Sequence, residues 1–402
     1  MSNQIINCKN DFPIFKNQQI VYLDTASTSQ KPQSVVNSII DFYQRYNANV
    51  HRGLYPWAEE ATAVYESARK KVAEYINANS ENLIFTKGTT ESINFISTSW
   101  GNENINESDN IVITEMEHHS NIVPWQILSK KTGAQLRYLP ISEGGELILD
   151  DMDKIIDENT KIVSVIHQSN VFGTINPIDL IIKEAHKKGA RVLVDAAQSI
   201  AHQEIDVKDI NCDFLVFSGH KMLGPTGIGA LYIKSDILDS IEPYQTGGQM
   251  IDQVNSNTST WNDIPFRFEA GTPNISGAIG MASAVDYIKD LTINKIQLHN
   301  HSITEYCVNE LRSINGIKIY GHNKKSGPVI SFNIKGVHSY DLSSILAKLG
   351  IYIRSGHHCA QPIMHKLNIT ASNRISLYIY NDLNDIDRLI EGVKKSQSML
   401  VN

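Results

Sequence analysis

Short apolar runs alternate with stretches of helical periodicity through the middle of the chain. The apolar runs predict strands at residues 83–85, 110–113, 161–166, 191–194 and 215–217. Between them, one helix is expected to begin at Gly88-Thr-Thr-Glu91 and another to occupy residues 180–188. Near-continuous apolar strands separated by helices predict a mainly parallel sheet with both faces covered. The fold class is therefore α/β.

Helical and shorter mixed segments flank this middle region. Residues 1–20 are expected to form an N-terminal arm, and residues 33–46 and 58–77 predict two helices. Residues 243–262 are polar and contain glycine, which indicates an irregular loop. A long helical region with a break at 277–314 is followed by short elements at 317–320, 329–334, 340–349, 351–354, 375–380 and 383–399. We predict a large domain over residues 21–285 and a smaller C-terminal α/β domain over residues 286–402.

The composition is that of a globular protein without a nucleic-acid-binding surface. Of the 402 residues, 41% are hydrophobic and 20% are charged, and the net charge is −7. No apolar run approaches the roughly 20 residues that a membrane span needs. The N-terminus lacks the basic start and apolar core of a signal peptide. The four cysteines, Cys8, Cys212, Cys307 and Cys359, form no Cys-x-x-Cys pair, so we expect a reducing, cytoplasmic location.

Polar side chains follow the predicted strands at the positions where the strands end. In mainly parallel sheets, ligands bind outside the carboxyl ends of the strands. The polar residues that fall at this edge are Thr89, Thr90, His118, Asn170, Asp195, Gln198, Ser218, His220 and Lys221. We expect these side chains to meet at one site.

Lys221 is the most informative residue of this group. It follows a buried strand and the small residues Ser218 and Gly219, and Gly224 and Pro225 keep the next segment out of a helix. A lysine on such a turn is placed to form a Schiff base with an aldehyde, because desolvation and nearby cations lower its pKa. For a lysine taken alone, a solvated position after a strand is the more common explanation.

Asp195 and the turn that contains Thr90 extend this interpretation toward pyridoxal 5'-phosphate. A carboxylate at a strand end can pair with a pyridinium nitrogen, and Gln198 can reach the ring hydroxyl. A helix begins near Thr90, and the free amides at its N-terminus favour an anion such as phosphate. Ser218 and His220 can complete this phosphate-binding site. Asp195 and the Gly88-Thr-Thr90 turn each also have an ordinary explanation as a helix cap.

Four further residues are candidates for ligand binding. His118 opens a helix, where an imidazole can stack on a cofactor ring and move protons, although such a histidine is more often structural or solvated. Asn170 can bond to a ring oxygen or simply serve a turn. Arg354 and Arg374 can each hold a carboxylate in bidentate fashion, or they can be solvated surface arginines.

Cys359 lies in the segment Ile353-Arg-Ser-Gly-His-His-Cys-Ala-Gln-Pro362. Nearby cationic groups lower the pKa of a thiol, and the thiolate is the nucleophile, so Cys359 is a candidate nucleophile. A free, partly buried cysteine is the alternative. We predict no metal site, because the contiguous side chains of His357, His358 and Cys359 diverge.

These residues together resemble one known family, the pyridoxal-phosphate-dependent cysteine desulfurases of the SufS type. That family lies within the class V aminotransferase group of fold type I enzymes. The resemblance extends from residue 22 to the last helix. Its most specific pieces are His51-Arg-Gly53, Glu117-His-His119, Ser218-Gly-His-Lys221, Arg267-Phe-Glu-Ala-Gly-Thr-Pro-Asn274 and Arg354-Ser-Gly-His-His-Cys-Ala360.

The resemblance implies a role for each candidate residue. It implies that Lys221 carries pyridoxal 5'-phosphate as a Schiff base and that Cys359 takes the sulfur of L-cysteine as a persulfide. The other implied cofactor contacts are Asp195 to the pyridine nitrogen, Gln198 and Asn170 to the ring oxygen, His118 stacked on the ring, and Thr90, Ser218, His220 and a neighbouring subunit's Thr272 to the phosphate. The implied substrate contacts are Arg354, Arg374, Asn170 and His51.

The resemblance also implies partners. A homodimer with shared sites is expected, since Thr272 in the family reaches the phosphate of the other subunit. The short span from Arg354 to Cys359 is similar to the Suf-type subgroup, in which an acceptor protein of the SufE or SufU type takes the persulfide sulfur for iron–sulfur cluster assembly. Selenocysteine lyase activity is also expected. One departure is Ser27, where relatives usually have alanine, in a loop that lies near the substrate pocket in the family.

Two other functions remain open from the sequence. Another fold type I enzyme, such as a kynureninase-like hydrolase or an aminotransferase, needs the lysine and the aspartate but not Cys359. A non-catalytic scaffold for iron–sulfur cluster assembly keeps the fold without the chemistry. The presence of Lys221, Asp195 and Cys359 in one chain favours the desulfurase.

Overall fold

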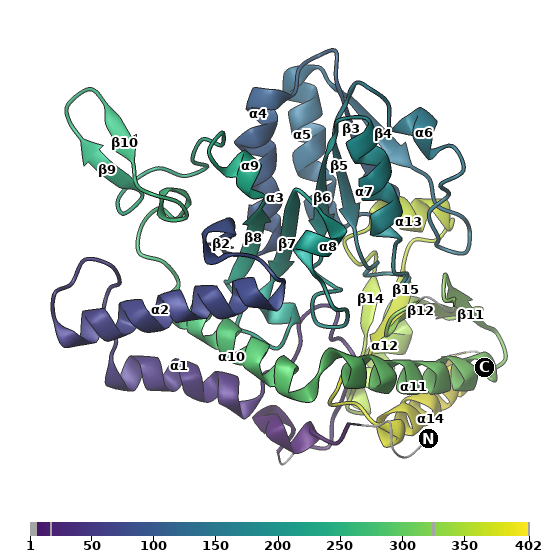
Figure 1. The fold of residues 1–402 in the computed structure, drawn as a ribbon. Coiled ribbons are helices and arrows are strands. Elements are labelled where there is room, and N and C mark those ends of the chain that lie inside the picture. Colours follow the sequence, from purple (N-terminus) through teal and green to yellow (C-terminus); the bar gives the residue numbers. More distant parts are fainter. Residues whose placement is uncertain (1–5, 17, 324–325, 401–402) are drawn as a thin grey trace.

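The apolar runs form a seven-stranded sheet at the centre of the molecule (Figure 1). The computed structural model describes residues 6–16, 18–323 and 326–400. In spatial order the strands are β2 (Leu83–Thr86), β8 (Gly229–Ile233), β7 (Phe214–Ser218), β6 (Arg191–Asp195), β5 (Thr160–Ile166), β3 (Asn110–Thr114) and β4 (Gln135–Leu139). Strands β7 to β4 in this order pair in parallel, whereas β8 lies antiparallel to β2 and β7. This confirms the predicted α/β fold with a mainly parallel sheet.

Helices cover both faces of this sheet. Successive residues of a strand point to opposite sides, so strands that are apolar throughout present an apolar face on each side of the sheet. On β6, Val192 and Val194 face one core and Leu193 faces the other. The helices of the first core are α1 (Gln33–Arg45), α2 (Pro56–Tyr75), α7 (Ile178–Lys187) and α10 (Ile275–Leu291). Those of the second core are α3 (Thr89–Thr98), α4 (Trp100–Asn104) and α5 (Val123–Thr132).

The C-terminal part of the chain builds a second, antiparallel sheet with its own core. Its strands are β11 (Ile317–Tyr320), β12 (Val329–Ile334), β15 (Ser372–Ser376) and β14 (Arg354–Gly356), and its helices are α11 (Ile293–Arg312), α12 (Ser339–Lys348) and α14 (Leu383–Leu400). The short strand β1 (Val21–Tyr22) pairs in parallel with β13 (Ile351–Tyr352). Val21 and Leu23 are buried in this C-terminal core. The predicted domain boundary at residues 285 and 286 stays a prediction.

The connecting segments contain one unexpected feature. Within the predicted loop at 243–262, β9 (Ile251–Val254) and β10 (Ser259–Trp261) form a hairpin that projects from the body of the molecule (Figure 1). Its side chains are mostly exposed, which explains why no buried apolar pattern marks it. The predicted break in the long helical region falls at Thr292, where a φ of 66° separates α10 from α11. The remaining short helices are α6 (Met152–Ile155), α8 (Val207–Ile210), α9 (Ser235–Leu238) and α13 (Gln361–Lys366).

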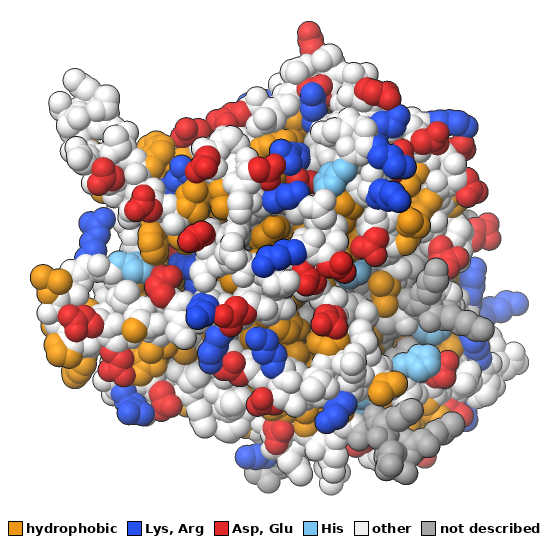
Figure 2. Space-filling model, viewed as in Figure 1, with side chains coloured by type: hydrophobic (Ala, Val, Ile, Leu, Met, Phe, Trp, Pro, Cys, Tyr) orange, Lys and Arg blue, Asp and Glu red, His pale blue; other side chains and the backbone are white. Residues whose placement is uncertain are grey.

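The surface carries charges of both signs. Acidic and basic side chains are interspersed over the face that Figure 2 shows. Among the described residues, no helix is both long enough and apolar enough to cross a membrane.

His202 is a buried histidine that couples folding to pH. Its Nδ1 lies 3.1 Å from Asn300 Nδ2, and its ring packs edge-on against Tyr378. Burial lowers the pKa of His202 from 6.5 to about 4. Below pH 6.5 the unfolded chain therefore takes up a proton that the folded chain does not bind. The contribution of His202 to stability is present above pH 6.5 and is lost as the pH falls toward 4.

We expect His202→Gln to flatten the acid side of the stability profile. The free energy of unfolding should fall with decreasing pH less steeply in the variant, by up to about 1.4 kcal/mol per pH unit below about pH 6. Urea unfolding at several pH values measures this slope. His301→Gln is the matched control, since the His301 side chain is 61% exposed. Equal slopes for the His202 variant and the parent protein would contradict the prediction.

Candidate active site

One cavity at the carboxyl edge of the central sheet brings most of the predicted site residues together. Its volume is about 210 Å³. The predicted residues that line it are Thr89, Thr90, His118, Asn170, Asp195, Gln198, Ser218, His220, Lys221, Arg354, Cys359 and Arg374. The central sheet and the C-terminal part therefore contribute to the same cavity.

Lys221 ends a single 3₁₀ turn, η6 (Gly219–Lys221), that follows β7 directly. The turn needs glycine at Gly219, because a Cβ there would come within 2.9 Å of Ile228 Cγ2. Burial lowers the pKa of the Lys221 ammonium group, Asp195 opposes this shift, and Arg374 adds to it. The net effect is a larger fraction of neutral amine, which is the nucleophilic form.

Asp195 is a buried carboxylate at the end of β6, only 2% exposed. Among the described residues its one hydrogen bond comes from Ala197 N to Oδ1, at 2.9 Å. Burial raises the pKa of Asp195, and the Ala197 N–H and the Lys221 charge oppose the rise. A buried carboxylate with so few protein partners suits a cationic nitrogen of a ligand. Gln198 lines the same cavity, and its Nε2 donates to Ala26 O at 2.8 Å.

The N-terminus of α3 and the end of β7 form a cup of hydrogen-bond donors. Gly88 precedes the helix with a φ of 151°, and a Cβ on it would lie 3.1 Å from Ser218 Oγ. Thr89 N donates to Ser218 Oγ at 2.9 Å. Thr90 Oγ1 bonds to Ser120 Oγ at 2.7 Å. Helix-terminal amides with several hydroxyl groups are a donor set that suits phosphate.

His118 and His220 are both held as neutral imidazoles. Burial lowers the pKa of His118 to about 3 and that of His220 to about 4, and Lys221 adds to both shifts. His118 Nδ1 accepts a hydrogen bond from Ser120 N at 3.1 Å, so the proton of this neutral ring is on Nε2. A neutral ring can pack against another flat ring without electrostatic penalty.

Glu117 lies directly before His118 and is buried. The sequence did not predict that its side chain holds the turn that carries His118. It accepts hydrogen bonds from Thr114 Oγ1 at 2.6 Å, from Ile166 N at 2.9 Å and from Asn121 Nδ2 at 2.7 Å. These bonds tie the turn that carries His118 to the end of β5. Burial raises the pKa of Glu117 to about 8. The only sequence signal for it was its place in the Glu117-His-His119 motif.

Ser27 joins the two arginines of the cavity. Its Oγ accepts from Arg354 Nη1 at 2.7 Å and from Arg374 Nη2 at 2.8 Å, and it donates to Asp24 Oδ1 at 2.6 Å. Arg374 Nη2 also donates to Asp24 Oδ1 at 3.0 Å. The Arg374 Nε is buried and has no hydrogen-bond partner among the described residues, so this donor is left for a ligand. Asp24 was not predicted as part of the site, and for Ser27 only the family resemblance placed its loop near the substrate pocket.

The Cys359 loop is held in an unusual backbone conformation. His358 and Cys359 have φ values of 53° and 54°, a region that non-glycine residues rarely occupy. Asn170 Nδ2 donates to His358 O at 2.7 Å, and His119 N donates to Cys359 O at 2.8 Å. The His358 ring bonds to Ser372. Burial lowers the pKa of His358 to about 2, Arg374 adds to this shift, and the bond to Ser372 opposes it. Contacts to both parts of the molecule therefore fix the thiol at the cavity.

Two predicted residues do not reach the cavity of their own chain. His51 was expected at the substrate, but its Nε2 bonds to Glu66 Oε1 and its Nδ1 to Gln249 Nε2, both at 2.9 Å. The expected contact of His51 with the substrate therefore stays a prediction. Thr272 lines a separate pocket beside Glu91, of about 470 Å³. Its expected contact with a second subunit stays a prediction.

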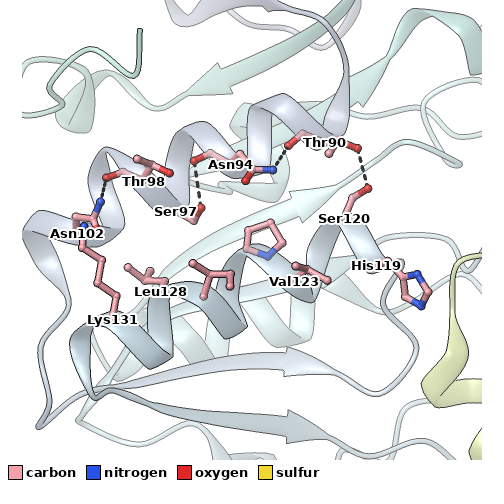
Figure 3. Close-up of a pocket in the computed structure, with 12 residues that line it drawn as sticks. Thr90, Asn94, Ser97, Thr98, Asn102, His119, Ser120, Val123, Leu128 and Lys131 are labelled. Carbon is pink, nitrogen blue, oxygen red and sulfur yellow. Dashed lines mark hydrogen bonds between the residues drawn. The ribbon is translucent and has the colours of Figure 1, made fainter.

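A groove between α3 and α5 continues from the cavity (Figure 3). Its volume is about 440 Å³, and Thr90 and Ser120 line both the groove and the cavity. In Figure 3, His119 lies at one end of the groove, next to the ribbon of the C-terminal segment.

Comparison with known proteins gives a consistent result over nearly the whole chain. The profile of the family described as aminotransferase class-V matches residues 21–389. A protein of Halalkalibacterium halodurans named "Probable cysteine desulfurase" is 49% identical over 379 residues, which cover 94% of this chain and 93% of the relative.

Solved structures agree with the sequence comparison. The apo structure of a cysteine desulfurase from Thermococcus onnurineus matches with a TM-score of 0.94 and 38% identity, covering 97% of each chain. The structure of the cysteine desulfurase CsdA from Escherichia coli, in an S-sulfonic acid form, matches with a TM-score of 0.92 and 35% identity, covering 98% of each chain.

Proposed function

The chain belongs to the aminotransferase class-V family, and on this premise we propose that it is a cysteine desulfurase that depends on pyridoxal 5'-phosphate. It converts L-cysteine to L-alanine and takes the sulfur onto Cys359 as a persulfide. The observation that carries the proposal is the meeting of Lys221, Asp195 and Cys359 in one cavity. This reaction needs an amine, an acid for a pyridine nitrogen and a thiol nucleophile together.

The donor set of the cavity fits pyridoxal 5'-phosphate. Lys221 would bind the aldehyde carbon, Asp195 the pyridine nitrogen and Gln198 the ring oxygen. The phosphate would lie at the N-terminus of α3, with Thr90, Ser218 and His220. When bound, the cofactor supplies an electron-withdrawing ring that stabilises negative charge at the substrate Cα.

The chain's own side chains perform the remaining steps. Arg354 and Arg374 hold the substrate carboxylate. Lys221 Nζ removes the proton from the substrate Cα, and its lowered pKa makes the required neutral amine available. The Cys359 thiolate then attacks the substrate sulfur. The new S–S bond forms as the Cβ–S bond breaks, and the electron pair stays on carbon, which takes up a proton on the way to alanine.

The finer parts of the proposal rest on the family resemblance. The acceptor of the persulfide sulfur is a protein of the SufE or SufU type, and the sulfur goes on to iron–sulfur cluster assembly in the cytoplasm. The short span from Arg354 to Cys359 resembles SufS-type enzymes, and the similarity extends to CsdA, so the proposal covers the group that contains both. The protein acts as a homodimer in which each copy lends Thr272 to the phosphate of the other. Selenocysteine lyase activity is a second candidate function, because selenium leaves carbon more readily than sulfur.

Product analysis tests the proposal directly. The holoprotein is incubated with L-cysteine, with and without a candidate acceptor, and alanine, sulfide and the mass of the Cys359 peptide are measured. A cysteine desulfurase yields alanine and a Cys359 persulfide, and the acceptor raises the turnover. A kynureninase-like hydrolase or an aminotransferase yields no persulfide, and a non-catalytic scaffold lacks the cofactor absorbance. Either result would refute the proposal.

Ser27→Ala tests how the two arginines meet the substrate. The Ser27 hydroxyl competes with the substrate carboxylate for Arg354 and Arg374, since it accepts from both. We expect its removal to lower KM for L-cysteine by about 3- to 10-fold, with kcat changed less than about twofold. Steady-state kinetics measures both constants. Ser313→Ala, at the exposed end of α11, is the control. A raised KM would mean that the hydroxyl instead holds the arginines in their binding positions.

A further inference from the structure

Three potential metal ligands lie close together, His119, His357 and Cys359, and the last of them lines the cavity. One ligand atom from each lies within 4.8 Å of the ligand atoms of the other two. His119 belongs to the 3₁₀ turn η5 (His119–Asn121) after β3, whereas the other two lie between β14 and α13. Figure 3 shows His119 beside the C-terminal ribbon, at the end of the groove. The cluster therefore arises from the fold, because these segments are far apart in the sequence.

Hydrogen bonds fix the relative positions of the two segments. His119 N donates to Cys359 O at 2.8 Å, and Gln361 N donates to His119 Nε2 at 3.1 Å. Cys359 N donates to His357 Nδ1, also at 3.1 Å. The two rings lie 5.6 Å apart between centroids. Because His119 Nε2 and His357 Nδ1 accept these bonds, they are the ring nitrogens that carry a lone pair. Both lone pairs are directed toward the Cys359 loop.

His358 does not belong to this cluster. Its Nε2 bonds to the Ser372 carbonyl at 3.1 Å and to Ser372 Oγ at 3.0 Å, and its side chain is buried. His358 therefore diverges from its neighbours, as the sequence predicts, whereas the ligand atoms of His357 and Cys359 lie within 4.8 Å of each other, against that expectation. The third ligand comes instead from His119, which no local spacing reveals.

We propose that His119, His357 and Cys359 form a binding site for one thiophilic divalent cation, such as Zn²⁺. Two imidazoles and one thiolate are ligands that Zn²⁺ prefers, and a fourth position stays open to water or a ligand thiol. On binding, Cys359 releases its thiol proton to solvent and the thiolate bonds to the metal. The metal takes the two imidazole lone pairs from the N–H groups of Cys359 and Gln361. Both of those hydrogen bonds are solvent-exposed, so water can replace the lost acceptors.

Charge around the cluster determines which cations can bind. Arg354 and Arg374 line the same cavity. Their guanidinium groups repel a cation. A hard ion such as Mg²⁺ or Ca²⁺ gains little from sulfur and nitrogen ligands. The site is therefore selective for Zn²⁺ or Co²⁺ over Mg²⁺ and Ca²⁺.

The bound metal blocks the Cys359 thiol as a nucleophile. If the proposed function is correct, Zn²⁺ also inhibits persulfide formation at Cys359. This inhibition is the one consequence that rests on the proposed function. Metal binding itself does not require that Cys359 accept sulfur. The experiments below therefore measure binding and thiol protection rather than activity.

Cobalt titration of the reduced holoprotein tests the site. We expect one equivalent of Co²⁺ to produce the visible bands of a tetrahedral cobalt thiolate site, and Zn²⁺ to displace it. Cys359→Ser and His357→Ala should each weaken Zn²⁺ binding at least about tenfold in competition with a chelating dye. His365→Ala, an exposed histidine on α13, is the matched control. Absence of the bands in the parent protein, or equal affinity in all variants, would overturn the proposal.

Thiol protection provides a second readout that does not depend on desulfurase activity. The parent protein is treated with iodoacetamide in the presence of Zn²⁺, Mg²⁺ or no metal, and the Cys359 peptide is quantified by mass spectrometry. Zn²⁺ should slow alkylation of Cys359 at least about tenfold, Mg²⁺ should not, and His357→Ala should remove most of the protection. Equal alkylation rates with and without Zn²⁺ would overturn the proposal, even if the protein converts L-cysteine to alanine.

Discussion

Lys221→Ala is expected to lower the rate of alanine formation from L-cysteine by at least about 10³-fold. Among the described residues, Lys221 is the only lysine that lines the cavity. Two tasks are proposed for it: it binds the cofactor aldehyde, and it moves the proton of the substrate Cα. Alanine can do neither. The imine absorbance band should disappear, and dialysis should remove a cofactor that only noncovalent contacts retain. Absorbance spectra and alanine quantification measure the two effects separately.

Lys31 provides the matched control for this prediction. Its ammonium group bonds to the carbonyl oxygens of Ser29 and His220, and His220 immediately precedes Lys221. Burial lowers the pKa of Lys31 to about 8, so part of this amine is also neutral near physiological pH. Because Lys31 bonds to carbonyls and does not line the cavity, Lys31→Met should keep the imine band. If the imine band persisted in Lys221→Ala and vanished in Lys31→Met, the Schiff base would form on Lys31, and its assignment to Lys221 would be wrong.

Hydrophobicity predicts most of the central strands that are buried on both faces, but it misses β4 and β8. All five residues of β7 are buried, and so is most of β5. β4 escaped detection because only Leu139 among its residues is buried. β8 was not predicted because it begins at Gly229, and glycine normally indicates a break in regular secondary structure. A Cβ at Gly229 would lie 2.5 Å from Gly88 Cα, so this glycine permits close packing next to the anion cup.

The candidate site was predictable where it follows from strand ends. Asp195 and Ser218 are the last residues of β6 and β7, and a sheet places such ends together. Contacts between distant segments were not predictable, because periodicity carries no information about them. Ser27 lies more than 300 residues before the two arginines that it bonds to. For Cys359, only the family resemblance, and not the local pattern, implied a place at the same site.

Cys359→Ser is expected to leave the cofactor spectrum unchanged and to lower alanine formation from L-cysteine at least about 100-fold. A serine hydroxyl does not ionise near neutral pH and cannot accept sulfur as a persulfide. Cys8, Cys212 and Cys307 cannot substitute, since they are buried and burial raises the pKa of each, that of Cys8 to about 11 and that of Cys307 to about 12. Mass spectrometry after exposure to L-cysteine should find the persulfide on Cys359 in the parent protein and none in the variant.

L-Selenocysteine separates sulfur acceptance from the chemistry at Lys221. Selenium leaves carbon more readily than sulfur, so direct elimination can bypass Cys359, and we expect Cys359→Ser to retain activity toward L-selenocysteine. Activity toward L-selenocysteine but not toward L-cysteine would show that the variant lacks only the sulfur-accepting thiol. In the proposed mechanism, both substrates need Lys221 and Asp195 equally. Cys307→Ala is the matched control, and it should retain activity toward both substrates. A Cys359→Ser protein inactive toward both would exclude the bypass, whereas one that kept the parent rate with L-cysteine would remove Cys359 from the mechanism.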